Sequence, residues 1–249
     1  MVFFIKPSPS ILLCVLVFLC LPFISAAHQY PDSSKFRQQS NNMLKTLVER
    51  YTGPYISIED PDVLAAMRNV PRHLFVPPKQ QHAAYQDSPL GIGYGQTISQ
   101  PYIVALMTQL AEIANSMKVL AVGTGSGYQA AILFELTPNV YTIEIIEPLA
   151  KRTHNLFKKL GLHGLQYKQG DGYYGWPGNV KFDRILVTAA AAHIPVPLLA
   201  QLKPGGRMVI PVGPKWGHQQ LLLIKKDQKG NSTTESILPV RFVPLTGGK

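Results

Sequence analysis

Three glycines alternate with small polar residues directly after an apolar stretch of the chain. They are Gly123, Gly125 and Gly127. Glycine lets the backbone bend sharply and approach a ligand closely because it has no Cβ, and the helix expected after the turn offers free N–H groups. A second apolar strand, Val140–Glu144, follows about one helix later, and its terminal carboxylate suits a ribose hydroxyl. The turn and Glu144 together predict a nucleotide-binding site near the middle of the chain.

A second carboxylate follows the next predicted strand. Asp171 stands between Gly170 and Gly172, after the strand Leu165–Gln169. In an open α/β sheet, ligands bind beyond the carboxyl ends of the parallel strands, so Asp171 should lie near Glu144 and the glycine turn. There it can accept a hydrogen bond from an exocyclic amine such as that of adenine. The alternative is a turn aspartate that caps the segment after it.

The composition is that of a globular protein with one domain. Of 249 residues, 46% are hydrophobic and 15% are charged, which provides enough apolar material for one α/β core. The formal net charge is +10, but the basic residues are scattered, so we expect no nucleic-acid partner. Both cysteines, Cys14 and Cys20, fall within residues 1–27. The remaining chain therefore has no disulfide, thiolate nucleophile or cysteine-ligated zinc, and we expect no bound metal.

Residues 1–27 read as a secretory leader. Lys6 precedes an uncharged apolar run, Ile11–Ile24, and Ser25–Ala27 supplies the small residues that an export peptidase favours. A permanent transmembrane helix is the weaker alternative, because the run is short and contains Pro22, and a mis-assigned start codon is another. We therefore predict an exported protein, periplasmic or secreted, with no stable membrane association once the leader is removed.

Helices and loops precede the glycine turn. Residues 28–42 are rich in Gln, Ser and Asn and predict a mobile arm ahead of the folded domain. Apolar residues then recur at helical spacing over Met43–Tyr51 and Asp62–Asn69, and Asp60 followed by proline predicts the start of the second helix. The stretch 71–101 is rich in Pro and Gly and predicts loops, which are usually functional when they are long.

From residue 102 onward, apolar patterns alternate between helical and strand spacing. This alternation predicts a mostly parallel, doubly wound sheet with helices on both faces. The last two strands have a short connection, which predicts an antiparallel edge strand. The predicted elements are helix Tyr102–Ile113, strand Lys118–Val122, helix Tyr128–Leu136, strand Val140–Glu144, helix Pro148–Leu160, strand Leu165–Gln169, strand Phe182–Thr188, helix Pro197–Gln201, a turn at Lys203–Arg207, strand Arg207–Pro211 and strand Gln220–Lys226.

The segment Gly91–Tyr102 reads GIGYGQTISQPY and carries a family resemblance. With the glycine turn, the strand ending in Glu144 and the run Gly170–Gly172, it resembles the protein-L-isoaspartate (D-aspartate) O-methyltransferase family. Many methyltransferases and dehydrogenases share a glycine turn, but the part Gln96–Pro101 is nearly private to this family. The resemblance implies an α/β fold of the Rossmann-like type found in class I S-adenosylmethionine-dependent methyltransferases. This methyltransferase domain would cover residues 43–249.

The resemblance also implies a reaction. A methyl group passes from the sulfonium of S-adenosyl-L-methionine to the free α-carboxylate of an L-isoaspartyl residue, and of a D-aspartyl residue as a second substrate, in damaged proteins and peptides. The ester then cyclises to a succinimide that opens partly to normal aspartate, which is repair. Because the carboxylate is already a nucleophile, the rate should come from positioning and exclusion of water. Ser99, the family's active-site residue, would orient the carboxylate by a hydrogen bond.

The resemblance assigns further residues to the two binding sites. The backbone of Val187–Ala190 is expected to pair with an extended substrate, which would explain tolerance of many peptide sequences. Carboxylates are ionised at neutral pH, so His73 and His193 are expected to be structural or rim residues rather than bases. The implied donor-site residues are Gly123, Thr124, Gly125, Ser126, Gly127, Glu144, Asp171 and Gly172, and the implied substrate-site residues are Thr97, Ile98, Val187, Thr188, Ala189, Ala190 and Arg241.

One departure from the family pattern leaves alternatives open. Ala121 stands where the family usually has Asp or Glu, and the missing carboxylate would remove a charge-assisted contact worth about 1.5–3 kcal/mol. A non-catalytic relative that binds isoaspartyl peptides but has weakened donor binding is therefore an alternative. A nicotinamide-dependent oxidoreductase is another, although it does not account for Gln96–Pro101. We expect the protein to be a monomer. The alternative to export is the cytoplasmic location that is usual for the family.

The leader predicts a defined mature N-terminus. If an export peptidase acts after Ala27, the purified protein should begin at His28. Intact-mass measurement of protein from a membrane-free extract checks this. A mass that retains Met1 would contradict the leader.

Overall fold

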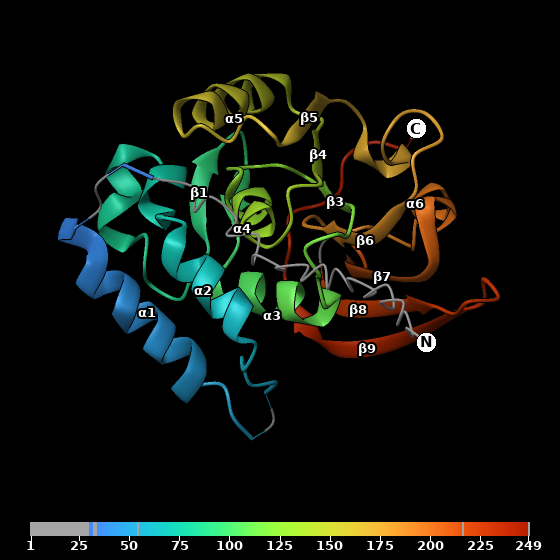
Figure 1. Ribbon diagram of the computed structural model, residues 1–249, viewed down its shortest axis with the longest axis horizontal. Coiled ribbons are helices and arrows are strands. Elements are labelled where there is room, and N and C mark those ends of the chain that lie inside the picture. The colour runs from blue at the N-terminus through green and yellow to red at the C-terminus, as the bar shows by residue number, and fades with distance from the viewer. Residues whose placement is uncertain (1–29, 32–33, 54, 216, 249) are drawn as a thin grey trace, which may run out of the picture.

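The computed structural model describes residues 30–248 except 32, 33, 54 and 216, so the predicted leader lies outside the described residues. Within them, a seven-stranded sheet runs through the centre of the molecule (Figure 1). Its first five strands in spatial order are parallel, and the last two are added antiparallel to their neighbours. In spatial order they are β5 (Gln166–Gln169), β4 (Val140–Glu144), β3 (Val119–Val122), β6 (Phe182–Val187), β7 (Leu202–Val212), β8 (Gln219–Lys226) and β9 (Ser232–Val240).

Strand β3 shows how the sheet is buried on both faces. All of its residues are apolar and buried, as expected for a central parallel strand. Val119 and Ala121 belong to one core cluster, whereas Leu120 and Val122 belong to the other, because successive side chains of a strand point to opposite faces. Because side chains alternate between the two faces of the strand, Ala121 lies in the core cluster that also holds residues of the N-terminal helices.

Helices cover both faces of the sheet (Figure 1). Helices α1 to α5 contribute to the first core cluster and α6 to the second. Within the described part of the chain, no helix is both long and apolar enough to cross a membrane. The helices are α1 (Arg37–Glu49), α2 (Pro61–Asn69), α3 (Pro101–Ala111), α4 (Tyr128–Leu136), α5 (Glu147–Lys159) and α6 (Val196–Gln201).

The two N-terminal helices confirm one boundary and change another. Asp60 caps α2 as predicted, since its carboxylate accepts hydrogen bonds from the N–H groups of Asp62 and Val63. Helix α1 begins at Arg37 rather than at residue 43, so the second half of the arm predicted for 28–42 is helical. Phe36, just before α1, is buried and supplies the apolar contact that the polar sequence of this segment does not suggest.

The Pro- and Gly-rich stretch contains a hairpin and short 3-10 helices. Tyr94 has φ of 54° and is flanked by Gly93 and Gly95, both with positive φ, which makes the tight turn. Propensity alone does not predict strands this short. The elements are β1 (Leu90–Gly93), β2 (Gln96–Ile98), η2 (Arg72–Phe75) and η3 (Pro78–Ala83), with η1 (Ser34–Phe36) and η4 (Gly172–Tyr174) elsewhere in the chain.

The antiparallel edge is larger than predicted. Strand β7 begins at Leu202 and includes the predicted turn Lys203–Arg207, where its pairing with β6 is irregular. Strand β9 was not predicted, because its first five residues are all polar and exposed. An edge strand can form on backbone hydrogen bonds without an apolar run, so hydropathy does not reveal it.

Residue His73 is a titratable side chain in the core. Its ring stacks on Phe36 at 3.9 Å between centroids, and Nδ1 lies 2.9 Å from the Tyr85 hydroxyl. Burial first, and then the charge of Lys35, lower its pKa from 6.5 to about 4. The neutral ring is therefore the native form at neutral pH.

We predict that stability falls as the pH is lowered from about 6.5 to about 4. The folded state resists binding a proton that the unfolded chain accepts, so His73 contributes a slope of at most about 1.4 kcal/mol per pH unit. Denaturant unfolding at several pH values measures it. His73→Gln should have a shallower slope in this window, and above pH 7.5 the two proteins should respond to pH alike. Equal slopes at low pH would contradict this assignment.

Candidate active site

A cavity lies at the carboxyl ends of β3, β4 and β6. It brings together segments that are far apart in the sequence: the glycine turn, the end of β4, the segment after β2 and part of the C-terminal segment after β9. Most of the predicted donor-site and acceptor residues line it. Those that do are Thr97, Ile98, Ser99, Gly123, Thr124, Gly125, Ser126, Glu144, Gly172, Thr188 and Ala189.

The Glu144 carboxylate fixes the glycine turn. Its Oε2 accepts a hydrogen bond from the Gly125 N–H at 2.8 Å, and its Oε1 accepts one from the Ile146 N–H at 2.9 Å. From the other side, the Thr153 hydroxyl donates to the Gly125 carbonyl at 2.6 Å. A carboxylate has about four lone-pair positions, so Glu144 retains capacity for ligand hydroxyls.

Residue Thr188 holds the first glycine of the turn. Its hydroxyl donates to the Gly123 carbonyl at 2.7 Å. Gly123 has φ of +87°, and a Cβ there would lie 2.9 Å from the Thr188 Oγ1. Glycine is therefore required by both the backbone conformation and the close approach of β6.

Two predicted donor-site positions have structural roles outside the cavity wall. A Cβ on Gly127 would lie 2.5 Å from the Phe157 ring, so this glycine allows α5 to pack against the start of α4. Asp171 caps η4 by accepting from the Tyr173 N–H, and its Oδ2 accepts from the Gly248 N–H at 2.8 Å. Neither residue lines the cavity, and the turn-cap alternative for Asp171 is what the structure shows.

Residue Ala121 does not line the cavity either. Its side chain is buried in the first core cluster, on the opposite face of β3 from Val122. In the sheet, Ala121 pairs with Thr142 of β4. The Thr142 hydroxyl lies 3.0 Å from the Ala121 carbonyl and 2.8 Å from the Thr124 hydroxyl. Hydroxyl groups thus connect β4 to the start of the glycine turn, in addition to the carboxylate of Glu144.

The Ser99 hydroxyl is free to meet a ligand. Within the described residues, its Oγ has no hydrogen-bond partner, whereas its carbonyl accepts from Arg72. Ser99 lines the cavity and also a larger groove beside it. The groove has a volume of about 620 Å³ and the cavity about 60 Å³. Ser99 therefore stands where the two spaces meet.

The position of Ser99 depends on a buried arginine that the sequence analysis did not identify. Arg72 has no exposed surface, and it donates to the carbonyls of Ala84 at 2.8 Å and Ser99 at 2.6 Å. Its guanidinium lies 4.9 Å from the centre of the Tyr128 ring. Burial lowers the pKa of Arg72 to about 10, so it still carries its charge at neutral pH. The signal in the sequence was a lone arginine next to a proline, which is not specific.

A second support, also missed, is the Asp87 carboxylate. It accepts hydrogen bonds from the Tyr51 hydroxyl, from Gln100 Nε2 at 3.1 Å and from the Tyr102 N–H at 2.9 Å. The last of these is a free amide in the first turn of α3. Burial and this carboxylate raise the pKa of Tyr51, so its hydroxyl remains a donor. Asp87 thus joins Tyr51, which follows α1, and the first turn of α3 to the residue after Ser99.

The predicted pairing of a substrate with Val187–Ala190 needs correction. The Ala190 N–H donates to the Val243 carbonyl, and the Ala190 carbonyl accepts from the Leu245 N–H, both at 2.8 Å. Val187 is paired with Val122 of β3. The backbone N–H and C=O of Ala190 are therefore already hydrogen-bonded to the chain's own C-terminal segment. Thr188 and Ala189 remain in the cavity wall.

Neither histidine considered as a base lies in the cavity wall. His73 is buried against Tyr85, as described above, and His193 is exposed with its Nε2 at 3.1 Å from the Tyr173 hydroxyl. In the part of the chain that the structure describes, no three His, Cys, Asp or Glu side chains form a group that could hold a metal ion. Arg241, the remaining predicted substrate residue, lines the groove rather than the cavity.

Comparisons with known proteins agree on one family. Residues 40–249 match the family model described as protein-L-isoaspartate(D-aspartate) O-methyltransferase. The chain is 58% identical over 189 residues to protein-L-isoaspartate O-methyltransferase 2 of Syntrophobacter fumaroxidans, covering 76% of each. It is 47% identical over 229 residues to protein-L-isoaspartate O-methyltransferase of Opitutus terrae, covering 92% of this chain and 95% of that one.

Solved structures share the fold. One described as protein-L-isoaspartate O-methyltransferase has a TM-score of 0.68 at 26% identity, covering 85% of this chain and 66% of that chain. A Plasmodium falciparum protein assigned to the same family, solved in complex with S-adenosyl-L-homocysteine, has a TM-score of 0.71 at 24% identity, covering 83% of this chain and 98% of that chain. The Rossmann-like α/β fold predicted from the sequence is confirmed.

Removal of the buried guanidinium should loosen the Ser99 segment. Arg72→Met leaves two carbonyls without their donor, and we expect the free energy of unfolding to fall by about 2–4 kcal/mol. Hydrogen exchange at the amides of 96–100 should become faster, measured under conditions where the variant is folded. The matched control is Arg68→Met on the exposed face of α2, with an expected change within about 0.5 kcal/mol. Unchanged exchange in Arg72→Met would contradict the role assigned to the guanidinium.

Proposed function

The chain belongs to the protein-L-isoaspartate(D-aspartate) O-methyltransferase family, and we propose that it methylates the free α-carboxylate of L-isoaspartyl residues in damaged proteins and peptides. The observation that supports this best is the unpartnered Ser99 hydroxyl at the junction of the cavity and the groove. We place the methyl donor in the cavity and the peptide in the groove. D-aspartyl residues are the second substrate that the family's description suggests.

The cavity wall fits a nucleoside donor. S-adenosyl-L-methionine, when bound, supplies an electrophilic methyl group on a sulfonium. The backbone of the glycine turn is open to close approach, because Gly123 and Gly125 carry no Cβ and both have positive φ. Glu144 is 5% exposed, lines the cavity and can accept hydrogen bonds from ribose hydroxyls with its remaining lone pairs.

The cavity is small for a nucleoside donor. A volume of about 60 Å³ is well below the range of roughly 300–1,000 Å³ that is usual for ligand pockets. We propose that the C-terminal segment moves, because Thr246 lines the cavity and is exposed, and the Gly248 N–H rests on the Asp171 carboxylate. Asp171 would then be free to accept a hydrogen bond from the adenine amine.

The acceptor needs positioning rather than activation. A carboxylate with an ordinary pKa near 4 is ionised at neutral pH, so no base is required. Ser99 donates a hydrogen bond to one carboxylate oxygen and leaves the other free to attack. The buried charge of Arg72, 2.6 Å from the Ser99 carbonyl, adds positive potential behind this position. Closure of the wall excludes water, which would weaken both effects.

Transfer forms a carboxyl–methyl bond and breaks a sulfur–methyl bond. The product ester is a better electrophile than the carboxylate, so the following backbone amide nitrogen can attack it and expel methanol. The resulting succinimide opens in water to aspartyl and isoaspartyl forms, and repeated cycles convert damage to normal aspartate. No observation favours the non-catalytic alternative.

We also propose that the protein is exported, on the composition of residues 1–27 alone. A monomer without stable membrane association or nucleic-acid partner remains our prediction. Export would separate the protein from the cytoplasmic supply of S-adenosylmethionine, so the mature N-terminus bears directly on where repair takes place.

The decisive assay measures transfer of labelled methyl to an isoaspartyl peptide and to its normal aspartyl isomer. We expect transfer only to the isoaspartyl peptide. Ser99→Ala should lower kcat/KM by about 10- to 100-fold, as expected for a lost hydrogen bond to a charged group. The control is Ser232→Ala on the exposed edge strand β9, which should be unchanged. Equal labelling of both isomers, or none of either, would refute the proposed function.

A further inference from the structure

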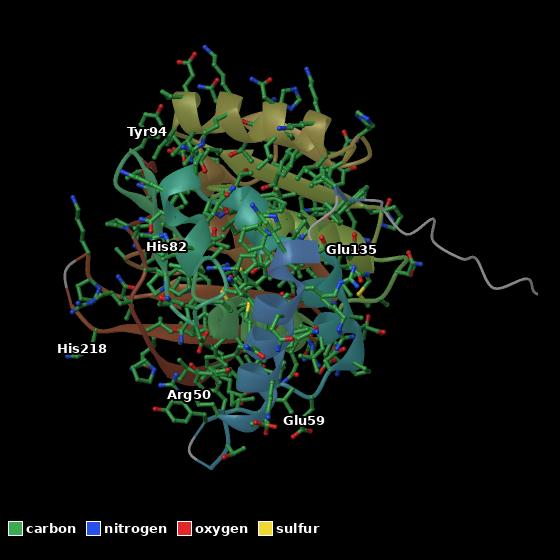
Figure 2. All side chains as sticks on the ribbon, turned by 90° about the vertical axis from the view of Figure 1, so that its left-hand side faces the viewer. Arg50, Glu59, His82, Tyr94, Glu135 and His218 are labelled. Atoms are coloured by element: carbon green, nitrogen blue, oxygen red, sulfur yellow. The ribbon has the colours of Figure 1, made fainter. Side chains whose placement is uncertain are left out.

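The groove beside Ser99 carries positive side chains in its wall. Arg50 and Arg241 line it, together with the imidazole of His218. None of the described residues that line it is an Asp or Glu. All of these basic side chains are exposed, so each is available to a bound molecule. Figure 2 labels Arg50 and His218 on the same lower part of the molecule.

The backbone beneath each arginine is anchored. The Arg50 N–H donates to the Thr46 carbonyl at the end of α1, and its guanidinium lies 6.0 Å from the centre of the Tyr51 ring. Beyond Arg241, the buried Gln219 side chain accepts from the Phe242 N–H at 2.7 Å and donates to the Phe242 carbonyl at 3.2 Å. The backbone next to each arginine is therefore fixed beside the groove, and the exposed side chains extend from it.

The groove and the donor cavity share a short stretch of wall. Thr97, Ser99 and Thr188 line both spaces. A carboxylate held at Ser99 for methylation therefore leaves the rest of its peptide in the groove. The residues on either side of the isoaspartyl residue then lie in the same groove as Arg50 and Arg241.

Two acidic side chains, Asp87 and Glu59, are not part of the groove wall. Asp87 lies behind Tyr51 and Gln100, and both side chains direct donors toward its carboxylate. Glu59, labelled on the same side in Figure 2, is not part of the groove wall. The wall therefore presents a positive potential to a bound peptide.

We propose that the groove selects isoaspartyl peptides that carry an acidic side chain directly next to the isoaspartyl residue. This inference rests on the proposed function and concerns its substrate class. Exposed ion pairs are individually weak, so the expected selectivity is a graded preference rather than an absolute requirement. Arg50 and Arg241 are the specificity-determining residues, because they are the arginines of the groove wall and carry permanent charges.

The test uses isoaspartyl peptides that differ only in the two flanking residues. One has serine on both sides, one has glutamate and one has lysine. We expect the KM for the glutamate peptide to be about three- to tenfold lower than for the lysine peptide, with the serine peptide between them and kcat unchanged. The difference should shrink as salt is raised from 0.05 to about 0.5 M, because exposed charges are screened.

Charge-reversal variants assign the effect to the groove. Arg50→Glu and Arg241→Glu should each reduce the preference, and the double variant should reverse it. The matched control is Lys168→Glu on β5, at the opposite edge of the sheet from β9, which changes net charge equally and should preserve the preference.

The outcomes separate the two proposals. If the serine peptide is methylated but all three peptides have one KM, the charge preference is wrong and the methyltransferase activity stands. If the double variant keeps the wild-type ranking, the groove arginines are not its cause and the inference is overturned. If no isoaspartyl peptide is methylated by the wild-type protein, the proposed function fails and this inference fails with it.

Discussion

The glycine turn after β3 is held by hydrogen bonds from β4, α5 and the end of β6, and the geometry of the site follows from this. Glu144, Thr153 and Thr188 each bond to the backbone of the turn. Parallel strands bring their carboxyl ends to one edge of the sheet, so these groups converge although they are far apart in sequence. The turn can then present its backbone to a ligand without side chains in the way.

The facing wall is built differently. The segment that carries Ser99 belongs to a short hairpin, which has little stability of its own. The buried guanidinium of Arg72 holds its Ser99 carbonyl, and the carboxylate of Asp87 holds Gln100 and Tyr102 next to it. These side chains connect it to η2, to Tyr51 beyond the end of α1 and to the first turn of α3, which lie outside the seven-stranded sheet. The site therefore lies between a sheet edge and a loop fixed by buried charge.

The distribution of charge suits a reaction that consumes an anion. A buried arginine lies behind the acceptor position, and further arginines line the groove where a peptide would extend. Methylation converts the acceptor carboxylate into a neutral ester, so the product loses part of the attraction that brought the substrate in. Electrostatic attraction that is lost on reaction favours release of the product.

The sequence by itself determined the order of the core elements and the chemistry of the glycine turn. Apolar periodicity and the spacing of glycines are local, and strand ends in a parallel sheet meet wherever they occur in the chain. Only the tertiary structure decided which groups are already satisfied. The backbone of Ala190 is paired with the C-terminal segment, Asp171 is held by Gly248, and Arg72 is buried behind Ser99. Hydrogen bonds between distant residues leave no periodic trace, so a single sequence cannot reveal them.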